Sequence, residues 1–140
     1  MNFILDTCII SELVKPKPNS KVIKWVSSCP EETLYLSTLT IGEIQKGISI
    51  LPESHKKDDL EKWLNQDLMR RFDRRIVGID IKVAQKWGEI QAQTEKKGVK
   101  MPVVDSLIAA TGLVHDMTVV TRNVDDMKSS SVTLFNPWKN

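Results

Sequence analysis

The chain has 140 residues, of which 41% are hydrophobic and 27% are charged. This balance is typical of a globular domain and excludes a disordered or fibrous chain, and the length allows one hydrophobic core rather than two. The formal net charge is only +2, from 20 Lys and Arg against 18 Asp and Glu, so overall charge gives no argument for a nucleic-acid partner.

Five short apolar blocks, rich in β-branched or large side chains and flanked by turn residues, predict strands buried on both faces. They lie at 3–5, 34–36, 76–79, 119–120 and 132–135. Apolar residues at helical spacing predict helices over 39–51, 60–72, 81–97 and 102–115, and Asn19-Ser20 can cap a helix over 21–28. This alternation predicts a single α/β domain over 1–140, with a mainly parallel central sheet flanked by helices on both faces.

The N-terminus carries no basic region of the kind that begins a signal peptide, and Asp6 interrupts the first apolar run. No stretch approaches the roughly 20 apolar residues that a membrane helix needs. We therefore expect a cytoplasmic protein without a membrane partner, in which Cys8 and Cys29 are reduced packing thiols. His55 and His115 lie far apart in sequence without a partner motif, and we assign them no role.

Acidic residues follow the predicted strands, and in parallel sheets ligands bind outside the carboxyl ends of the strands. The acids are Asp6 after the first strand, Glu43 after the second, Asp105 early in the last long helix, and Asp125 and Asp126 after the fourth strand. Because these ends meet at one edge, the acids are candidates for a shared site.

Each acid also has a local explanation. Asp6 fits a helix cap, and Thr40-Ile-Gly-Glu43 fits the S/T-x-x-E capping box. Asp105 lies in a first helical turn, where the helix dipole favours an acid, and one of Asp125 and Asp126 fits a plain loop acid. Taken singly, these alternatives stay open.

Taken together, the acids indicate a metal site. Glu43 and Asp105 lie off the apolar stripes of their helices, and ionised carboxylates 4 Å apart repel by about 4 kcal/mol at an effective dielectric constant of 20. A divalent cation relieves that repulsion, and an all-oxygen set suits Mg²⁺ or Mn²⁺ better than zinc. Four polar neighbours are placed to orient the acids or hold waters: Thr7, Ser11, Thr121 and Asn123. Carboxylate-held Mg²⁺ activates water for attack on a phosphoryl group, so we predict phosphodiester hydrolysis.

Four segments then carry a family resemblance across the chain: ILDTCIISELVKPKP, LSTLTIGEIQKGI, MPVVDSLIAATGLVHDMTVVTRN and LFNPW. In this order they resemble the PIN-domain ribonucleases, in particular the VapC-type toxins of bacterial toxin–antitoxin pairs and their FitB-like branch. The resemblance implies a Mg²⁺-dependent endoribonuclease toxin of a type II toxin–antitoxin system, held inactive by a cognate antitoxin protein and assembled as a homodimer. It also implies hydrolysis of RNA by a water activated at the carboxylate-bound metal.

The resemblance assigns roles residue by residue. The catalytic acids are Asp6, Glu43, Asp105 and, counting from Thr121-Arg122-Asn123, Asp126 rather than Asp125. Asp6 and Asp105 match the metal ligands, and Thr7, Thr121 and Asn123 match the supporting polar positions. Cys8 stands where many relatives have Asn and Met127 where an aromatic residue often follows the last acid; both departures leave the carboxylates intact.

RNA binding needs positive charge near an acidic pocket. The densest basic run predicts contacts from Arg70, Arg71, Arg74 and Arg75, with Lys96, Lys97 and Lys100 a second candidate. The alternative for the run is a solvated helix end that favours cations. The apolar face around Trp63 and Leu64 is either core or a groove for an antitoxin helix, and Trp25, Trp87 and Trp138 are predicted to be packing residues.

Two other functions compete with the nuclease. One is a catalytically silent PIN module that binds RNA or a protein partner. The other is a small phosphatase or receiver-like domain, which needs an aspartyl nucleophile, often in an Asp-x-Asp arrangement. Asp6-Thr7-Cys8 offers no second acid for that arrangement.

Overall fold

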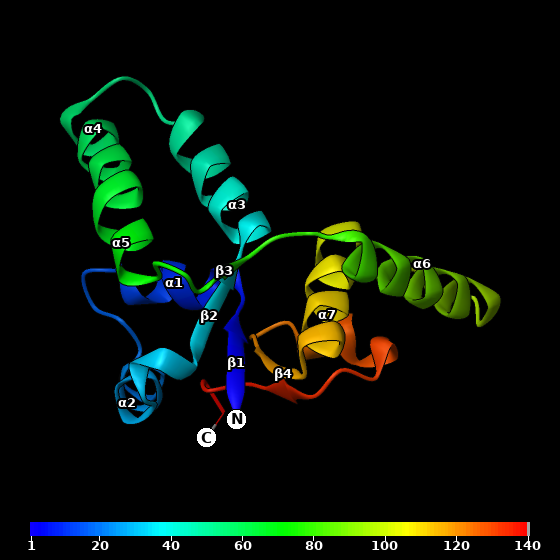
Figure 1. The fold of residues 1–140 in the computed structure, drawn as a ribbon. Coiled ribbons are helices and arrows are strands. Elements are labelled where there is room, and N and C mark those ends of the chain that lie inside the picture. The colour runs from blue at the N-terminus through cyan, green and yellow to red at the C-terminus, as the bar shows by residue number, and fades with distance from the viewer. Residues whose placement is uncertain (140) are drawn as a thin grey trace.

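The computed structural model describes residues 1–139, and its five strands form one parallel sheet in the order β3-β2-β1-β4-β5 (Figure 1). The strands are β1 (Asn2–Leu5), β2 (Leu34–Ser37), β3 (Ile76–Val77), β4 (Met117–Val120) and β5 (Leu134–Phe135). The chain builds outward from β1 to β3 and then returns to place β4 on the other side of β1. Strand order therefore reverses between β1 and β4, the position where open α/β sheets bind ligands.

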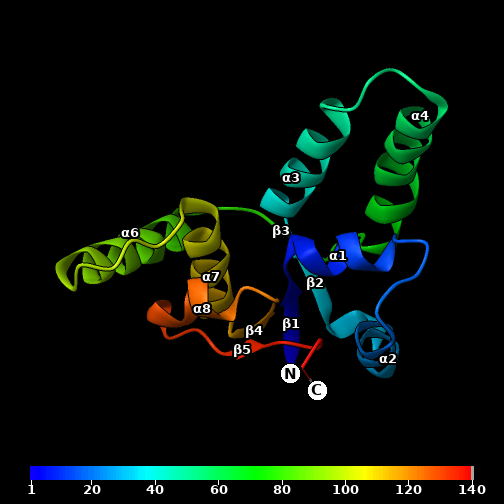
Figure 2. The ribbon, with the colours of Figure 1, turned by 180° about the vertical axis from the view of Figure 1, so that it is seen from behind.

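Helices cover both faces of the sheet, as the sequence predicts (Figures 1 and 2). The first group is α1 (Thr7–Leu13), α2 (Ser20–Ser28), α3 (Thr38–Ser49), α4 (His55–Lys62) and α5 (Met69–Arg71). The second group is α6 (Ile81–Lys96), α7 (Val103–His115) and α8 (Val124–Met127). Short 3₁₀ turns lie at Glu31–Thr33 and Lys128–Ser130, the second of them in a segment whose sequence suggests only a polar loop.

The core is divided by the sheet into two clusters. Leu5 and Val120 point into the cluster shared with α1, α2 and the α4–α5 segment, whereas Ile4 and Val119 point into the cluster shared with α6 and α7. Neighbouring residues of one strand thus face opposite layers, and burial on both sides explains why these strands are continuously apolar.

Several predicted boundaries differ from the structure. The helix predicted over 60–72 begins earlier, at His55, and its central part Trp63–Leu68 is a π-helix. The predicted strand over 76–79 ends at Val77, because the chain then turns toward Asp80, which caps α6 by accepting from the Val83 amide at 2.9 Å. Asn19 caps α2 as predicted, accepting from the amides of Lys21 and Val22. None of the helices within 1–139 is both long and apolar enough to cross a membrane.

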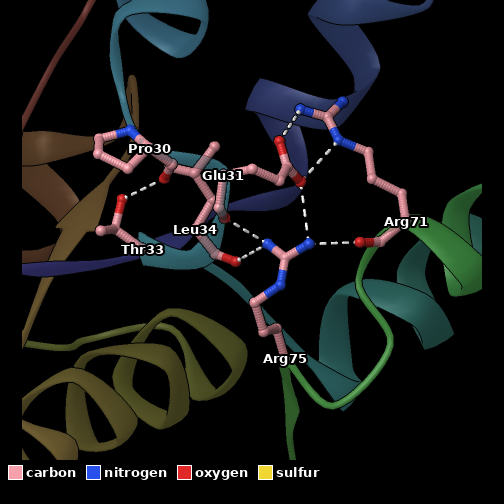
Figure 3. A network of polar contacts seen from close by, with 6 residues as sticks. All are labelled: Pro30, Glu31, Thr33, Leu34, Arg71 and Arg75. Atoms are coloured by element: carbon pink, nitrogen blue, oxygen red, sulfur yellow. Dashed lines mark hydrogen bonds and ion pairs between the residues drawn. The ribbon is translucent and has the colours of Figure 1, made fainter.

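The basic run ends the π-helical segment and is tied to β2 (Figure 3). Arg71 makes two hydrogen bonds of 3.1 Å to the Glu31 carboxylate, and Arg75 adds another of 3.0 Å. Arg75 also donates at 2.6 Å to the backbone carbonyls of Glu31 and Leu34. Because Leu34 begins β2, this network closes the amino end of the sheet, opposite the end where Asp6 follows β1. RNA binding by this run stays a prediction, and two of its guanidinium groups are engaged in fold contacts.

Gly112 sets the distance between α7 and the sheet. A Cβ added there would lie 2.9 Å from a methyl carbon of Val119, 3.0 Å from one of Val132 and 3.1 Å from the Met117 carbonyl oxygen. Backbone cannot move aside as a flexible side chain can, so only glycine lets α7 approach β4 this closely.

We predict that Gly112→Ala lowers the free energy of unfolding by roughly 1–3 kcal/mol, because overpacking outweighs the gain in helix propensity. Gly88→Ala, in α6 with open space around the added methyl group, is the matched control and is expected to stabilise by up to about 1 kcal/mol. Urea unfolding of both variants checks the opposite signs; equal shifts would contradict the close approach.

Candidate active site

Asp6 lies where β1 ends and α1 begins. Its backbone amide donates to the Val120 carbonyl at 2.9 Å, which continues the pairing of β1 with β4. One carboxylate oxygen, Oδ1, accepts from the Thr7 amide at 2.8 Å, so Asp6 caps α1; the other, Oδ2, accepts from the Thr121 hydroxyl at 2.7 Å. The cap and the site are therefore not alternatives, because the same carboxylate serves both.

Asp6 is buried, with only 4% of its surface exposed. Burial raises the pKa of Asp6, the hydrogen bonds from Thr121 and Thr7 oppose that rise, and the charge of Glu43 adds to it. The net pKa is raised, so ionised Asp6 is held at an electrostatic cost that a nearby cation would remove.

Thr121 fixes the second oxygen of Asp6 from the end of β4. Its amide donates to the Phe135 carbonyl at 2.9 Å, and its hydroxyl accepts from the Asn123 amide at 2.9 Å while donating to Asp6. The hydroxyl proton is thus committed to the carboxylate. Thr121 thus contacts Asp6 through its side chain, and Asn123 contacts Thr121 through its backbone amide.

Glu43 is an exposed residue of α3 that points toward α1. The capping-box alternative is wrong, because α3 begins at Thr38 and is capped by Ser37, whose hydroxyl accepts from the Leu39 amide at 3.0 Å. The Glu43 carboxylate instead accepts a short hydrogen bond from the Thr7 hydroxyl, which also lies 3.2 Å from the hydroxyl of Thr40. Thr7 therefore links Asp6, to which its amide donates, with Glu43.

Asp105 lies in the first turn of α7, where the charges of the other acids act on it. Burial raises its pKa to about 6, with further contributions from the charges of Asp6, Asp126 and Glu43. The helix dipole at this position favours an ionised acid, so burial and crowding outweigh it. The charges of acids from three other segments thus act on Asp105.

The start of α7 is held by a polar cluster that sequence reasoning missed. The hydroxyl of Ser106 accepts from the indole of Trp87 at 2.9 Å and from the side-chain amide of Gln91 at 2.7 Å, and donates to the Val103 carbonyl at 2.8 Å. This cluster fixes the residue next to Asp105 against α6. Only the helical spacing of Trp87 was visible in the sequence, so its hydrogen bond could not be predicted.

The chemistry of the acids fits a hard divalent cation. The acids supply only oxygen, and His55 and His115 lie on α4 and at the end of α7, outside the group. Within residues 1–139, no three His, Cys, Asp or Glu side chains are grouped closely enough to hold a metal ion. Sites built on one or two carboxylates are typical of Mg²⁺, because this cation keeps several of its own waters.

Cys8 lies beside Asp6 and Thr121, which are hydrogen-bonded to each other. Its sulfur is 3.8 Å from Oδ2 of Asp6 and 3.8 Å from the Thr121 hydroxyl, and it accepts from the Arg122 amide at 3.5 Å. Burial, followed by the charge of Asp6, raises the pKa of the Cys8 thiol. Cys8 is therefore a neutral thiol that donates weakly to Asp6, and it keeps a polar contact at this position.

An apolar groove of about 210 Å³ opens beside Thr7 and Glu43, between α1, α3 and the α4–π-helix segment. Its apolar lining includes Ile10, Val14, Ile44, Leu51, Leu60 and Trp63. The predicted apolar face around Trp63 thus contributes both to the core, through the buried Leu64 and Leu68, and to this groove.

Fold and site together define an α/β domain with a cluster of acids at the carboxyl edge of a parallel sheet. The family model of the PIN domain matches residues 3–129, and the chain belongs to this family.

The relatives agree with this assignment. The chain is 36% identical to the toxin FitB of Neisseria gonorrhoeae, covering 96% of this chain and 97% of that one. It is 29% identical to the VapC ribonuclease Y4jK of Sinorhizobium fredii, covering 97% of each. The crystal structure of FitAcB from Neisseria gonorrhoeae superposes with a TM-score of 0.94 at 35% identity, covering 99% of each chain.

We predict that Thr121→Val raises the pKa of Asp6, because the buried carboxylate loses its hydroxyl donor and the Asn123 amide loses its acceptor. Thr121→Ser keeps the hydroxyl and is expected to restore the wild-type value. Carbon-13 NMR titration of the aspartate carboxyl groups measures the shift. An unchanged Asp6 titration in Thr121→Val would contradict this arrangement.

We also predict that Asp105 titrates near pH 6 in the folded, metal-free protein. In the unfolded chain its pKa is 3.8, so between these pH values only the folded protein keeps the carboxyl group protonated. Its contribution to stability is therefore favourable below about pH 4 and declines as the pH rises through 6. A divalent cation favours the ionised form, so added Mg²⁺ is expected to lower this pKa and to bind more tightly as the pH rises. The same NMR titration with and without Mg²⁺ checks both effects, and a Mg²⁺-independent pKa would contradict them.

Proposed function

We propose that this protein is a Mg²⁺-dependent endoribonuclease, with Mn²⁺ as an alternative cation, and the toxin of a type II toxin–antitoxin pair. The observation that carries the proposal is the electrostatic coupling of Asp105 with Asp6, Glu43 and Asp126 at the strand-order reversal. The similarity to the toxin FitB and to the VapC ribonuclease Y4jK supports the same conclusion.

In this proposal Asp6 and Asp105 hold the cation, and Glu43 and Asp126 complete the acidic surface. When bound, the cation neutralises charge on the phosphodiester and makes water a stronger nucleophile. Thr7 and Thr121 keep the two oxygens of Asp6 in fixed directions, so little reorganisation is needed when the cation and RNA bind. Cys8, with its raised pKa, adds a neutral donor and no competing charge.

The alternatives are less well supported. A phosphatase with an aspartyl nucleophile needs an accessible carboxylate, whereas Asp6 is 4% exposed and both of its oxygens accept hydrogen bonds. A catalytically silent module would not need four coupled acids. Within residues 1–139, Asp6, Glu43 and Asp105 form no ion pair within 4 Å, so no basic side chain neutralises these acids.

The proposed protein partner is an antitoxin. A chain carrying an apolar helix into the groove lined by Ile44, Leu60 and Trp63 would reach the rim at Thr7 and Glu43, because these residues line the same groove. Such a partner would block the acidic site directly. The homodimer also remains a proposal, and light scattering of the purified protein without antitoxin tests it.

We predict that Asp6→Asn and Asp105→Asn each lower RNA cleavage with Mg²⁺ by roughly 100-fold or more, because each removes charge from the cation site. Glu89→Gln, an exposed acid of α6 outside the site, is the matched control and is expected to cleave normally. Cleavage of total RNA and circular dichroism are measured in parallel. Wild-type cleavage by either aspartate variant, in a folded protein, would overturn the metal assignment, and an inert wild-type protein would favour the silent module.

A further inference from the structure

Arg122 is a cation in the loop that forms the site, and its backbone is fixed on both sides. The hydroxyl of the preceding Thr121 binds Asp6, the Arg122 amide donates to Cys8 at 3.5 Å, and the Asn123 amide returns to Thr121 at 2.9 Å. The start of this side chain is therefore tied to the carboxylate that we assign to the cation.

The guanidinium group of Arg122 stacks on an aromatic ring instead of neutralising an acid. Its central carbon lies 4.2 Å from the ring centre of Trp138, and Arg122 forms no ion pair with a carboxylate of residues 1–139. The side chain is exposed. Its charge is felt at Cys8, whose pKa is raised by burial and by Asp6 and is lowered in part by Arg122.

Trp138 is itself anchored, although it lies near the end of the described chain. Its backbone amide donates to the side-chain oxygen of Asn136 at 2.9 Å, and the preceding Pro137 is buried. The indole packs against the core cluster of α1 and α2. It lies near Glu12 of α1, whose pKa is lowered mainly by the Asn19 amide and by Lys15, and in smaller part by the indole. The ring is thus a fixed platform for the guanidinium group.

This arrangement contrasts with the basic run at the other end of the sheet. There, the guanidinium groups of Arg71 and Arg75 donate hydrogen bonds to the Glu31 carboxylate, and Arg75 also donates to backbone carbonyls. Within residues 1–139 the Arg122 guanidinium pairs with no carboxylate, and it branches from the loop between Thr121, which binds Asp6, and Asn123. Stacking on an aromatic face leaves the edge donors of an arginine available for a phosphate.

We propose that Arg122 binds an RNA phosphate beside the cleaved bond and that Trp138 is a positioning residue that holds Arg122 in place. The inference rests on the proposed ribonuclease function and deepens it, because it assigns a cation for the substrate phosphate in the loop that also carries Thr121. The basic run of Arg70 to Arg75 then contributes less to binding near the site.

The test measures binding of a labelled single-stranded RNA of mixed sequence to the full-length protein, with a chelator present so that no cleavage occurs. The affinity is followed over a range of KCl concentrations. Loss of one phosphate contact on single-stranded nucleic acid lowers the slope of log affinity against log salt by roughly 0.7. We expect this decrease for Arg122→Ala, a smaller defect for Arg122→Lys, and an unchanged slope for Lys86→Ala on α6, whose ammonium group pairs with Glu89. Arg70→Ala reports separately on the basic run.

Trp138 is tested through Arg122. We expect Trp138→Ala to lower the slope as Arg122→Ala does, Trp138→Phe to retain most of it, and Trp138→Ala to add nothing in the Arg122→Ala background. An equal effect in both backgrounds would overturn the positioning role, and thermal unfolding of each variant identifies loss of fold.

The outcomes separate this inference from the proposed function. If the wild-type protein cuts RNA with Mg²⁺ but Arg122→Ala keeps the wild-type salt slope, Arg122 does not bind phosphate and the inference alone is overturned. A lowered slope for Arg70→Ala with none for Arg122→Ala would assign binding to the basic run and also overturn it. If Arg122→Ala weakens only antitoxin binding, the residue serves the protein partner; a wild-type protein that neither binds nor cuts RNA overturns both proposals.

Discussion

The buried carboxylate of Asp6 is the constraint on which the rest of the structure depends. It ends the central strand, caps α1 through the Thr7 amide and accepts the Thr121 hydroxyl from the neighbouring strand end. Its burial keeps it costly to ionise and the charge of Glu43 adds to that cost, while ionised Asp6 in turn raises the pKa of Asp105. The fold therefore concentrates negative charge at the point where strand order reverses, and a divalent cation is the chemically matched way to relieve it.

The two ends of the sheet have different roles: the amino end carries ion pairs that stabilise the fold, and the carboxyl end carries the acids of the candidate site. At the amino end, Glu31 forms ion pairs with Arg71 and Arg75, and these contacts fix the segment after the π-helix to the start of β2 (Figure 3). At the carboxyl end, Asp6, Glu43 and Asp105 form no ion pair with a basic side chain of residues 1–139. Two residues of α7 position Asp105 at this end. Gly112 lets α7 approach β4 closely, and Ser106 fixes the start of α7, where Asp105 lies.

The sequence allowed the parallel α/β architecture and the shared edge of Asp6, Glu43 and Asp105 to be predicted, because both follow from where strands end. The capping box at Thr40 and Glu43 is wrong, because β2 ends at Ser37 and this residue caps α3, which a local sequence pattern does not reveal. The pairing of Arg71 with Glu31 also escaped prediction, because residues 40 positions apart meet only once the sheet is formed. The same holds for Trp138, predicted as packing, which packs and also stacks under Arg122.

The central proposal is that the acidic edge binds a divalent cation, and the most direct test uses Mn²⁺ as a paramagnetic probe of backbone amide signals in NMR. Substoichiometric Mn²⁺ should broaden the signals of Thr7, Glu43 and Asp105 and leave those of Glu31 and Leu34, at the opposite end of the sheet, sharp. Excess Mg²⁺ should restore the broadened signals by displacement. Broadening that is absent, or that centres on Glu31 instead, would contradict the account.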